Sequence, residues 1–235
     1  KYLYLHNSST MNELVENLQL SQPSIRNMVR TLQEKQLIQE VGNDLSSGGR
    51  CPTRFALNEK NYLILCLYVQ VDKVIYQLRN FNEIKKEGIL FYQSEDELKK
   101  TIKDLIDQEK IHCCQIAVEG IVYEDVYVTD HHNVLEKHQW LKDIKKEINI
   151  PLQLQNDVKM IHQGCYFTYQ QDSTYYLYIN EVGIGSSYFY KDEPLYGRSG
   201  IMGEIGLISL KGKQSINKFV NVKTKKNLMR FLVCC

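Results

Sequence analysis

The sequence predicts an α/β protein in two parts, a helical N-terminal part over residues 1–60 and a larger part over residues 61–235. Apolar residues in the first part recur mostly three to five positions apart, which is the spacing of packed amphipathic helices. That part closes with two alternating segments around a glycine-rich turn, which predicts a β-hairpin. The larger part begins with strand-like segments at Leu63–Val69, Val74–Leu78 and Ile89–Tyr92, then a helix at Glu95–Gln108 and a strand at Cys114–Val118.

The composition excludes several classes of protein. Hydrophobic residues make up 43% of the 235 positions, which is enough to bury a core and too many for a disordered chain. The 29 basic and 28 acidic residues nearly cancel, so any binding of nucleic acid must come from a local patch. No apolar run has the length of a membrane helix and the first residues lack a secretory signal, so we expect a cytoplasmic protein without a membrane partner. The seven cysteines, an odd number, are expected to be reduced thiols.

Two polar residues in the first part predict where helices begin. Thr10, with Glu13 three residues later, forms a capping box for a helix over about Met11–Asn17. Ser21 is a favourable N-cap for a second helix over about Gln22–Lys35, and the proline in its first turn lacks only an N–H that would have no partner there.

The outward face of this second helix is predicted to be polar, because its apolar residues Ile25, Met28, Val29 and Leu32 are expected to face inward. The side chains that then face outward carry hydroxyl, amide and guanidinium groups. Such groups contact base edges and phosphates in DNA. In the hairpin that follows, Arg50 lies on a glycine-rich tip whose backbone can approach a phosphate or a narrow minor groove. The predicted DNA-contacting residues are Ser21, Gln22, Ser24, Arg26, Asn27, Arg30 and Arg50.

A small folded domain with a merely solvated polar face is the alternative interpretation. The distribution of charge favours DNA, because the basic residues gather on the second helix and the hairpin while Glu13 and Glu16 belong to the first helix. Those basic residues are Arg26, Arg30, Lys35, Arg50 and Arg54.

Four segments resemble the ROK family of repressors and sugar kinases. The segment LSQPSIRNMVRTLQEKQLIQEVGNDLSSGGRCPTRFALN is similar to the family's winged helix and its GGR wing. Downstream, INIPLQLQNDVKM, YINEVGIGSSYFY and GIMGEIGLISL resemble its Asn-Asp strand, its glycine-bearing hairpin and its Gly-Glu element. The resemblance covers roughly residues 1–210 and implies a winged helix-turn-helix over residues 1–60. It also implies an actin-like, sugar-kinase-like (RNase H-like) α/β domain over residues 61–235, whose second lobe is expected to be truncated or degenerate.

The resemblance implies a sugar site at Asn156, Asp157 and Glu204. In the family's kinases the Asn-Asp pair holds a sugar hydroxyl and the aspartate acts as the base, which is reasonable chemistry for a carboxylate beside a hydroxyl. Taken without the family, an Asn-Asp pair that follows a strand is more often a helix cap. Both interpretations stay open at this stage.

Several positions depart from the kinase pattern that the resemblance implies. Tyr68 and Gln70 occupy the places of a glycine-bearing phosphate turn, Leu207 that of a zinc-binding histidine, and Asn217 that of a second sugar-binding glutamate. We therefore predict no catalytic residue, no metal site and no cofactor.

The leading hypothesis is a repressor of carbohydrate-related genes that binds double-stranded operator DNA as a homodimer or higher oligomer and senses a sugar. One alternative is a sugar kinase that kept Asp157 and uses an altered nucleotide loop. Another is a DNA-binding protein whose effector site is dead. Trp140, the single tryptophan, is expected to border the sugar cleft, so that its fluorescence would distinguish a live sensor from a dead one.

Overall fold

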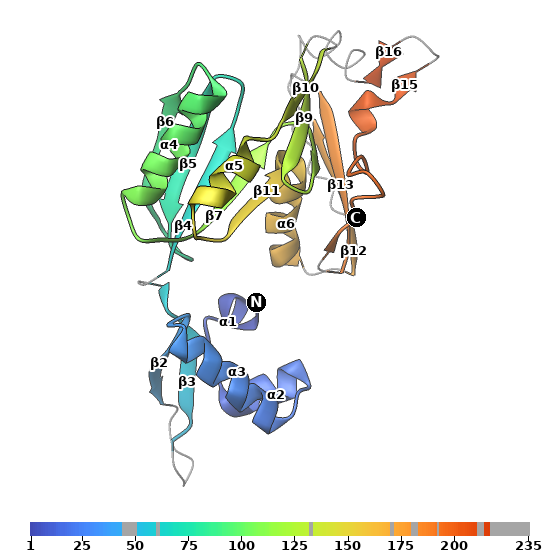
Figure 1. Ribbon diagram of the computed structural model, residues 1–235. Helices are drawn as coiled ribbons and strands as arrows, with labels where there is room; N and C mark the ends of the chain where they lie inside the picture. The colour runs from blue at the N-terminus through green and yellow to red at the C-terminus, as the bar shows by residue number, and fades with distance from the viewer. Residues whose placement is uncertain are drawn as a thin grey trace.

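The chain is a mixed α/β structure with a central five-stranded sheet (Figure 1). The structure is a computed structural model that describes residues 1–43, 51–59, 62–131, 134–169, 172–179, 183–191, 193–210 and 214–216. Arg50 and Asn217, both named above, lie outside the described residues.

The first 59 residues build a small core of their own from helices and a three-stranded antiparallel sheet of order β1-β3-β2. Apolar side chains from both helices and strands are buried in it: Leu3, Leu14, Ile25, Val29, Ile38 and Phe55. The elements are α1 (Tyr2–His6), β1 (Ser8–Thr10), α2 (Met11–Leu18), α3 (Gln22–Glu34), β2 (Ile38–Asn43) and β3 (Thr53–Leu57).

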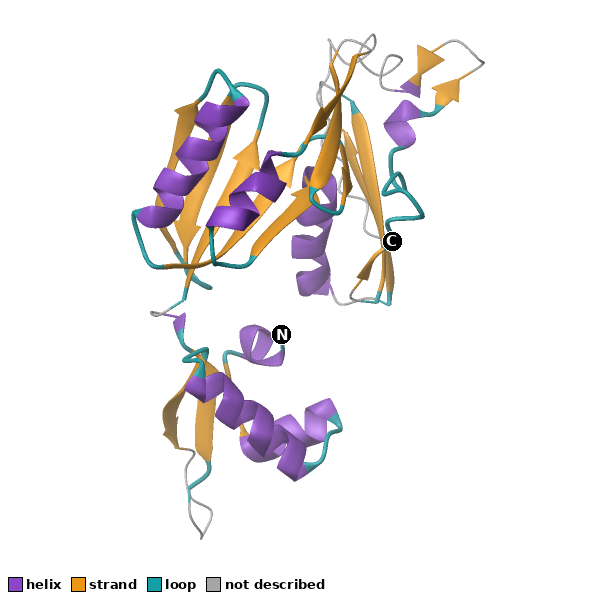
Figure 2. Cartoon of the chain, in the orientation of Figure 1, coloured by secondary structure: helices purple, strands orange, loops and turns teal. Residues whose placement is uncertain are grey.

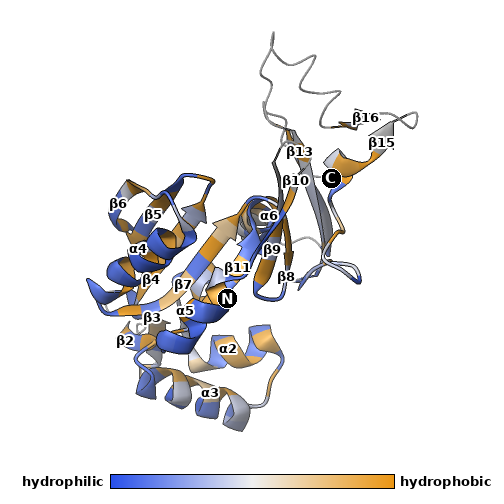
Figure 3. Cartoon of the chain, turned by 45° about the horizontal axis from the view of Figure 1, so that its top comes forward, coloured by the Kyte–Doolittle hydropathy of each residue, from blue (hydrophilic) through white to orange (hydrophobic). Residues whose placement is uncertain are grey.

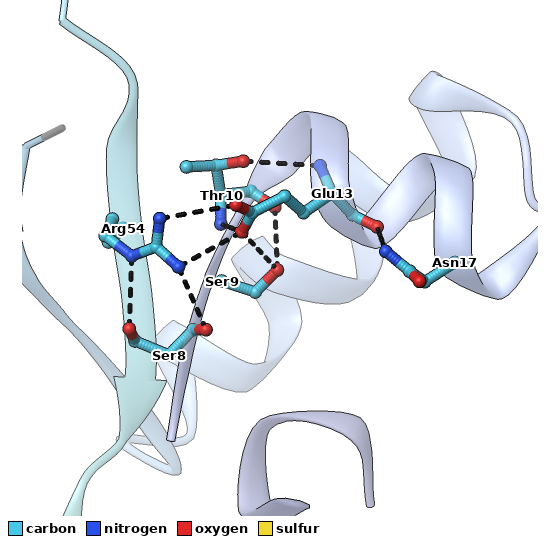
Figure 4. Close-up of polar contacts among 6 residues, drawn as sticks. All are labelled: Ser8, Ser9, Thr10, Glu13, Asn17 and Arg54. Atoms are coloured by element: carbon cyan, nitrogen blue, oxygen red, sulfur yellow. Dashed lines mark hydrogen bonds and ion pairs between the residues drawn. The ribbon is translucent and has the colours of Figure 1, made fainter. Parts of the chain in front are cut away.

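The predicted starts of α2 and α3 are confirmed. The Thr10 side chain accepts a hydrogen bond from the Glu13 N–H at 3.2 Å, and the Thr10 N–H donates to the Glu13 carboxylate at 2.8 Å, which completes the capping box (Figure 4). Ser21 caps α3 by accepting from the N–H of Ser24 at 3.4 Å. One inward-facing residue was predicted wrongly, because Met28 is 51% exposed. Helix α3 buries only a narrow stripe, which Ile25 and Val29 supply one turn apart.

The central sheet has the order β11-β7-β4-β5-β6, with β11, β7 and β4 parallel and β5 and β6 antiparallel. Helices α4 (Glu95–Asp107) and α5 (Trp140–Glu147) cover one face of this sheet and enclose the main hydrophobic core (Figure 2). The strands are β4 (Leu63–Val69), β5 (Lys73–Arg79), β6 (Ile84–Phe91), β7 (Ile111–Val118) and β11 (Leu152–Asn156).

Strand β6 begins earlier than the predicted Ile89, because backbone pairing with β5 extends it through a charged, exposed stretch from Ile84. At its centre the Tyr76 ring lies across Gly88, where an added Cβ would stand 2.8 Å from the ring. Strand alternation could not reveal this start, since β6 is exposed on both faces.

The remaining elements are helix α6 (Asp157–Tyr169) and three smaller sheets. The first has the order β10-β9-β8 and consists of β8 (Ile121–Tyr123), β9 (Val126–His131) and β10 (Val134–His138). The second, β12-β13-β14, packs against α6 and consists of β12 (Ser173–Ile179), β13 (Ile184–Tyr190) and β14 (Glu193–Pro194). The turn η2 (Ile205–Leu207) leads to the pair β15 (Ser209–Leu210) and β16 (Gln214–Ser215).

Hydropathy follows this layering. In Figure 3 helix α4 is coloured mainly hydrophilic, and hydrophobic colour appears on the strands beside it. The buried side of α4 is apolar and comprises Leu98, Ile102, Leu105 and Ile106. Within the described residues, no helix is both long enough and apolar enough to span a bilayer.

Candidate functional site

Two places in the chain gather the residues singled out from the sequence. The first is the outer side of α3, where six of the predicted residues are exposed: Ser21, Gln22, Ser24, Arg26, Asn27 and Arg30. The hydroxyls of Ser21 and Ser24 are 2.8 Å apart at the start of the helix, and Arg30 lies 3.8 Å from the Glu34 carboxylate in an exposed pair. The face is therefore polar and accessible, as predicted.

Arg54 has a different role from the one that its charge suggested. Its guanidinium donates to the Ser8 hydroxyl at 3.1 Å, to the Ser8 carbonyl at 3.2 Å and to the Glu13 carboxylate at 3.2 Å (Figure 4). These bonds tie β3 to β1 and to the first turn of α2. The predicted separation of basic and acidic residues is therefore wrong at this point, because Arg54 and Glu13 form an ion pair.

Replacing Arg54 by alanine is expected to lower the free energy of unfolding by about 1–2 kcal/mol, because several charge-assisted hydrogen bonds at a partly buried site are lost. Urea unfolding followed by circular dichroism measures the change. Lys35→Ala removes the same charge from the exposed end of α3 and serves as the control. A loss as small as that of the control would show that the Arg54 bonds contribute nothing to stability.

The second place is the edge of the central sheet where its three parallel strands end. Val69, Val118 and Asn156 lie opposite one another in the register of β4, β7 and β11. The residues that follow are brought together at this edge, which in open α/β sheets is where ligands bind. They include Gln70, Glu119 and Asp157.

A hydrogen-bonded cluster joins these residues. The Tyr68 hydroxyl donates to Glu119 Oε1 at 2.7 Å and lies 3.4 Å from Asp157 Oδ2. Gln70 Nε2 donates to the same Glu119 oxygen at 3.2 Å. Tyr68 and Gln70 occupy the places where the kinase pattern has a phosphate-binding turn. In this chain they instead hold a carboxylate, that of Glu119.

Burial controls the protonation of this cluster. Burial, with a smaller contribution from the neighbouring Glu119 charge, raises the pKa of Asp157 to about 6 against hydrogen bonds that lower it. Burial and the hydrogen bond to Glu119 also raise the pKa of the Tyr68 phenol, so this hydroxyl remains a donor. Asp157 thus changes charge close to physiological pH.

Asn156 and Asp157 cap helix α6. This agrees with the interpretation of the pair that did not depend on the family resemblance. Asn156 Oδ1 accepts from the Lys159 N–H at 3.1 Å, and Asp157 Oδ1 accepts from the Val158 N–H at 2.8 Å. The Asn156 amide also donates to the Gly120 carbonyl at 2.9 Å. Capping the helix does not prevent Asp157 from also binding a ligand, because Asp157 lines a cavity.

That cavity has a volume of about 160 Å³ and combines Asp157 with Glu119 and Glu204. Its other walls come from the N-terminus of α6 and from β12 and β13, through Asn156, Val158, Tyr178 and Ser186 among others. The structure thus brings together the three predicted sugar-site residues, Asn156, Asp157 and Glu204.

Lys159 lies behind Glu204 and was not anticipated from the sequence. Only 1% of this residue is exposed, its ammonium group donates to the Gly200 carbonyl at 3.0 Å, and it stands 5.3 Å from the centre of the Tyr196 ring. Burial lowers the pKa of Lys159 and raises that of Glu204, whereas the attraction between the two charges opposes both shifts. The one available signal was its place two residues after Asp157, in the first turn of α6.

Trp140 does not border this cavity, so that prediction is wrong. The residue is 1% exposed, because it starts α5 and packs into the sheet core, where its indole N–H donates to Tyr127 at 3.1 Å. It lines a separate cavity of about 190 Å³ on the other side of Glu119, together with His138.

Leu207 occupies the place where the kinase pattern has a zinc-binding histidine, and it is 44% exposed. Within the described ranges, no group of three or more His, Cys, Asp or Glu side chains is arranged to hold a metal ion. The described cysteines are not joined in disulfides: Cys51, Cys66, Cys113, Cys114 and Cys165.

The fold and the site together define a mixed α/β protein with the architecture found in ROK regulators and sugar kinases. The sequence profile of the ROK family matches residues 87–224, and the chain belongs to this family.

Similar proteins include both regulators and enzymes. The chain is 23% identical over 227 residues to the xylose repressor of Staphylococcus xylosus, in a match that covers 88% of this chain and 58% of the repressor. The crystal structure of a ROK family transcriptional regulator, a homologue of the E. coli Mlc protein, superposes with a TM-score of 0.71 at 18% identity and covers 87% of this chain and 56% of the regulator. A ROK family glucokinase from Streptomyces griseus, in complex with glucose and AMPPNP, superposes with a TM-score of 0.51 at 18% identity over 63% of this chain and 51% of the kinase. The chain therefore spans little more than half the length of these relatives.

Proposed function

We propose that the chain is a DNA-binding transcriptional repressor whose DNA affinity responds to a carbohydrate. Residues 1–60 form a winged helix-turn-helix in this proposal, and residues 61–235 form the effector and dimerisation domain. The observation that carries the proposal is the face of α3, because a helix anchored by Ile25 and Val29 presents hydroxyl, amide and guanidinium groups outward. The similarity to the xylose repressor supports it.

In this proposal α3 enters the major groove, and Ser21, Gln22, Ser24, Arg26, Asn27 and Arg30 contact bases and phosphates. Arg50, which follows the glycine pair in the sequence between β2 and β3, is proposed to contact the adjacent backbone or minor groove. A homodimer would place two such helices about 34–36 Å apart, or a multiple of that distance, on a two-fold operator.

Arg26→Ala is expected to weaken operator binding by about tenfold or more and to reduce the salt dependence of binding, because one exposed guanidinium leaves the interface. The operator is first recovered by mixing the chain with fragmented genomic DNA and sequencing the bound fragments. Affinity is then measured by fluorescence anisotropy at several salt concentrations. Lys100→Ala removes the same charge from the exposed side of α4 and is the matched control. Equal affinities for Arg26→Ala and Lys100→Ala would remove α3 from the interface.

The effector is proposed to bind in the 160 Å³ cavity, where Asp157 and Glu204 accept hydrogen bonds from sugar hydroxyls and Asn156 shapes the floor. A shift of the unfolding temperature by xylose, glucose or related sugars tests this part of the proposal. A flat response across the panel would favour the alternative in which the effector domain serves only dimerisation.

Sugar phosphorylation is the second candidate function, because the fold is shared with a ROK glucokinase and Asp157 has a raised pKa. We favour binding over catalysis, since the Tyr68 hydroxyl already engages the Asp157 carboxylate and Glu119 occupies the adjacent space. ATP-dependent phosphorylation that is lost in Asp157→Asn would make the kinase the better assignment.

A further inference from the structure

We propose that Glu119, held in place by Tyr68 and Gln70, makes the effector cavity exclude anions, so that the effector is an uncharged carbohydrate and not its phosphate ester. This inference rests on the proposed function, because it concerns the ligand of the same cavity. It assigns a specificity role to three residues that lie outside the predicted sugar site.

The charges of the lining residues are the first observation. The described residues around the cavity include three carboxylates, Glu119, Asp157 and Glu204, and no lysine, arginine or histidine. Glu204 has a nearby compensating charge, the buried Lys159, whereas no basic group is among the causes of the pKa shift of Asp157. The hydrogen-bond partners that the described residues give to the Glu119 and Asp157 carboxylates are Tyr68, Gln70 and the Val158 N–H, and none of them is basic. An entering phosphate would therefore meet like charge.

The two features that would attract an anion are engaged, at least in part, by the protein's own groups. A helix N-terminus binds anions through its free N–H groups, and α6 begins at this cavity. Two of the N–H groups in its first turn, those of Val158 and Lys159, donate to the side chains of Asp157 and Asn156. The Lys159 ammonium donates to the Gly200 carbonyl and is shielded from the cavity by its burial.

Glu119 cannot readily turn away from a ligand. Its Oε1 accepts hydrogen bonds from Tyr68 at 2.7 Å and from Gln70 at 3.2 Å, and both donors come from the end of the neighbouring strand β4. The Tyr68 phenol stays protonated and therefore remains a hydrogen-bond donor to this carboxylate. The negative charge is thus fixed beside Asp157. Neutral hydroxyl groups, in contrast, can donate to these carboxylates without repulsion.

The test compares each sugar with its own phosphate ester. Binding of xylose, glucose, their phosphate esters and inorganic phosphate to the full chain is measured by calorimetry at pH 7.5 and constant ionic strength. In the unmodified protein we expect one uncharged sugar to bind, its ester to bind at least about 100-fold more weakly, and inorganic phosphate not to bind. In Glu119→Gln we expect the gap between sugar and ester to narrow by about tenfold and weak phosphate binding to appear. Glu87→Gln removes a carboxylate from the exposed strand β6 and is expected to change neither ratio.

The outcomes separate this inference from the function on which it rests. If the unmodified protein binds sugar and ester equally, or if the gap is the same in Glu119→Gln, the anion exclusion is wrong and the sugar-responsive regulator stands. If no sugar binds at all, the proposal of a sugar effector is wrong. The binding of inorganic phosphate then still tests whether the cavity excludes anions. Phosphate binding that appears only in Glu119→Gln then supports it, and phosphate binding that is absent from both proteins, or present in both, overturns it.

Discussion

In the Asp157→Asn variant the free energy of unfolding is expected to fall by about 2 kcal/mol between pH 6.5 and pH 4 relative to the unmodified protein. The unmodified protein contains two buried groups, Asp157 and His162, whose pKa shifts have opposite effects on stability. His162 is common to both proteins, so the difference between them comes from the lost Asp157 contribution alone.

The first group is His162, which is 2% exposed on α6. Its ring nitrogens lie 2.9 Å from the Ser187 hydroxyl and 2.7 Å from the Thr174 hydroxyl. Burial lowers the pKa of His162 from 6.5 to about 4. Between these values the unfolded chain binds more protons than the folded one. The stability that neutral His162 contributes is therefore present above pH 6.5 and is lost as the pH falls to about 4.

Asp157 acts in the other direction. Its pKa is about 6 in the folded chain and 3.8 in the absence of the fold, so the folded chain binds more protons between these values. The penalty for burying this carboxylate is therefore relieved as the pH falls from about 6 to 3.8. A shift of about two pKa units corresponds to about 3 kcal/mol, which nearly offsets the loss from His162.

Urea unfolding at several pH values, followed by circular dichroism, measures these effects as differences from the unmodified protein. The matched variant is His162→Gln, whose stability relative to the unmodified protein is expected to rise as the pH falls from 6.5 to 4. A difference between Asp157→Asn and the unmodified protein that does not vary with pH would contradict the raised pKa of Asp157.

Much of the local structure could be predicted because it depends on residues close together in the sequence. The capping box joins Thr10 to Glu13, three positions later, and Ser21 caps the helix that follows it directly. Met28 was mispredicted for the opposite reason. How much of α3 is buried depends on which elements pack against it, and the spacing of apolar residues does not contain that information.

The site was predictable in part, through the family's Asn-Asp and Gly-Glu motifs. Its other members come together only in the folded sheet. Tyr68 and Asp157 are 89 residues apart, and Arg54 meets Ser8 across 46 residues. Polar residues such as Lys159 and His162 look like exposed positions of a helix until distant loops and strands supply their partners. A useful signal was the polar residue after each buried strand, since parallel strands end at a common edge.

Gly203→Ala is expected to destabilise the chain by about 3 kcal/mol or more and to abolish effector binding, because no side chain fits at this position. Gly203 has a φ of +100°, and an added Cβ would stand 2.2 Å from the Ser186 carbonyl oxygen. The loop cannot retreat without loss, since the Gly203 carbonyl accepts from the Ser186 N–H at 3.1 Å and from its hydroxyl at 2.8 Å. Any displacement moves the next residue, Glu204, out of the cavity.

Alanine substitutions at two other glycines distinguish this steric clash from the strain of a positive φ. At Gly197 φ is +66° but the nearest atom to an added Cβ is 3.4 Å away, so alanine there is expected to cost about 1 kcal/mol. At Gly164, inside α6, an added Cβ meets nothing within 4 Å, so alanine is expected to stabilise the chain by about 0.5–1 kcal/mol through helix propensity. Thermal unfolding of the three variants measures this order. If Gly203→Ala proved no worse than Gly197→Ala, the loop that carries Glu204 would not be held against β13, and Glu204 would lose its fixed place in the effector site.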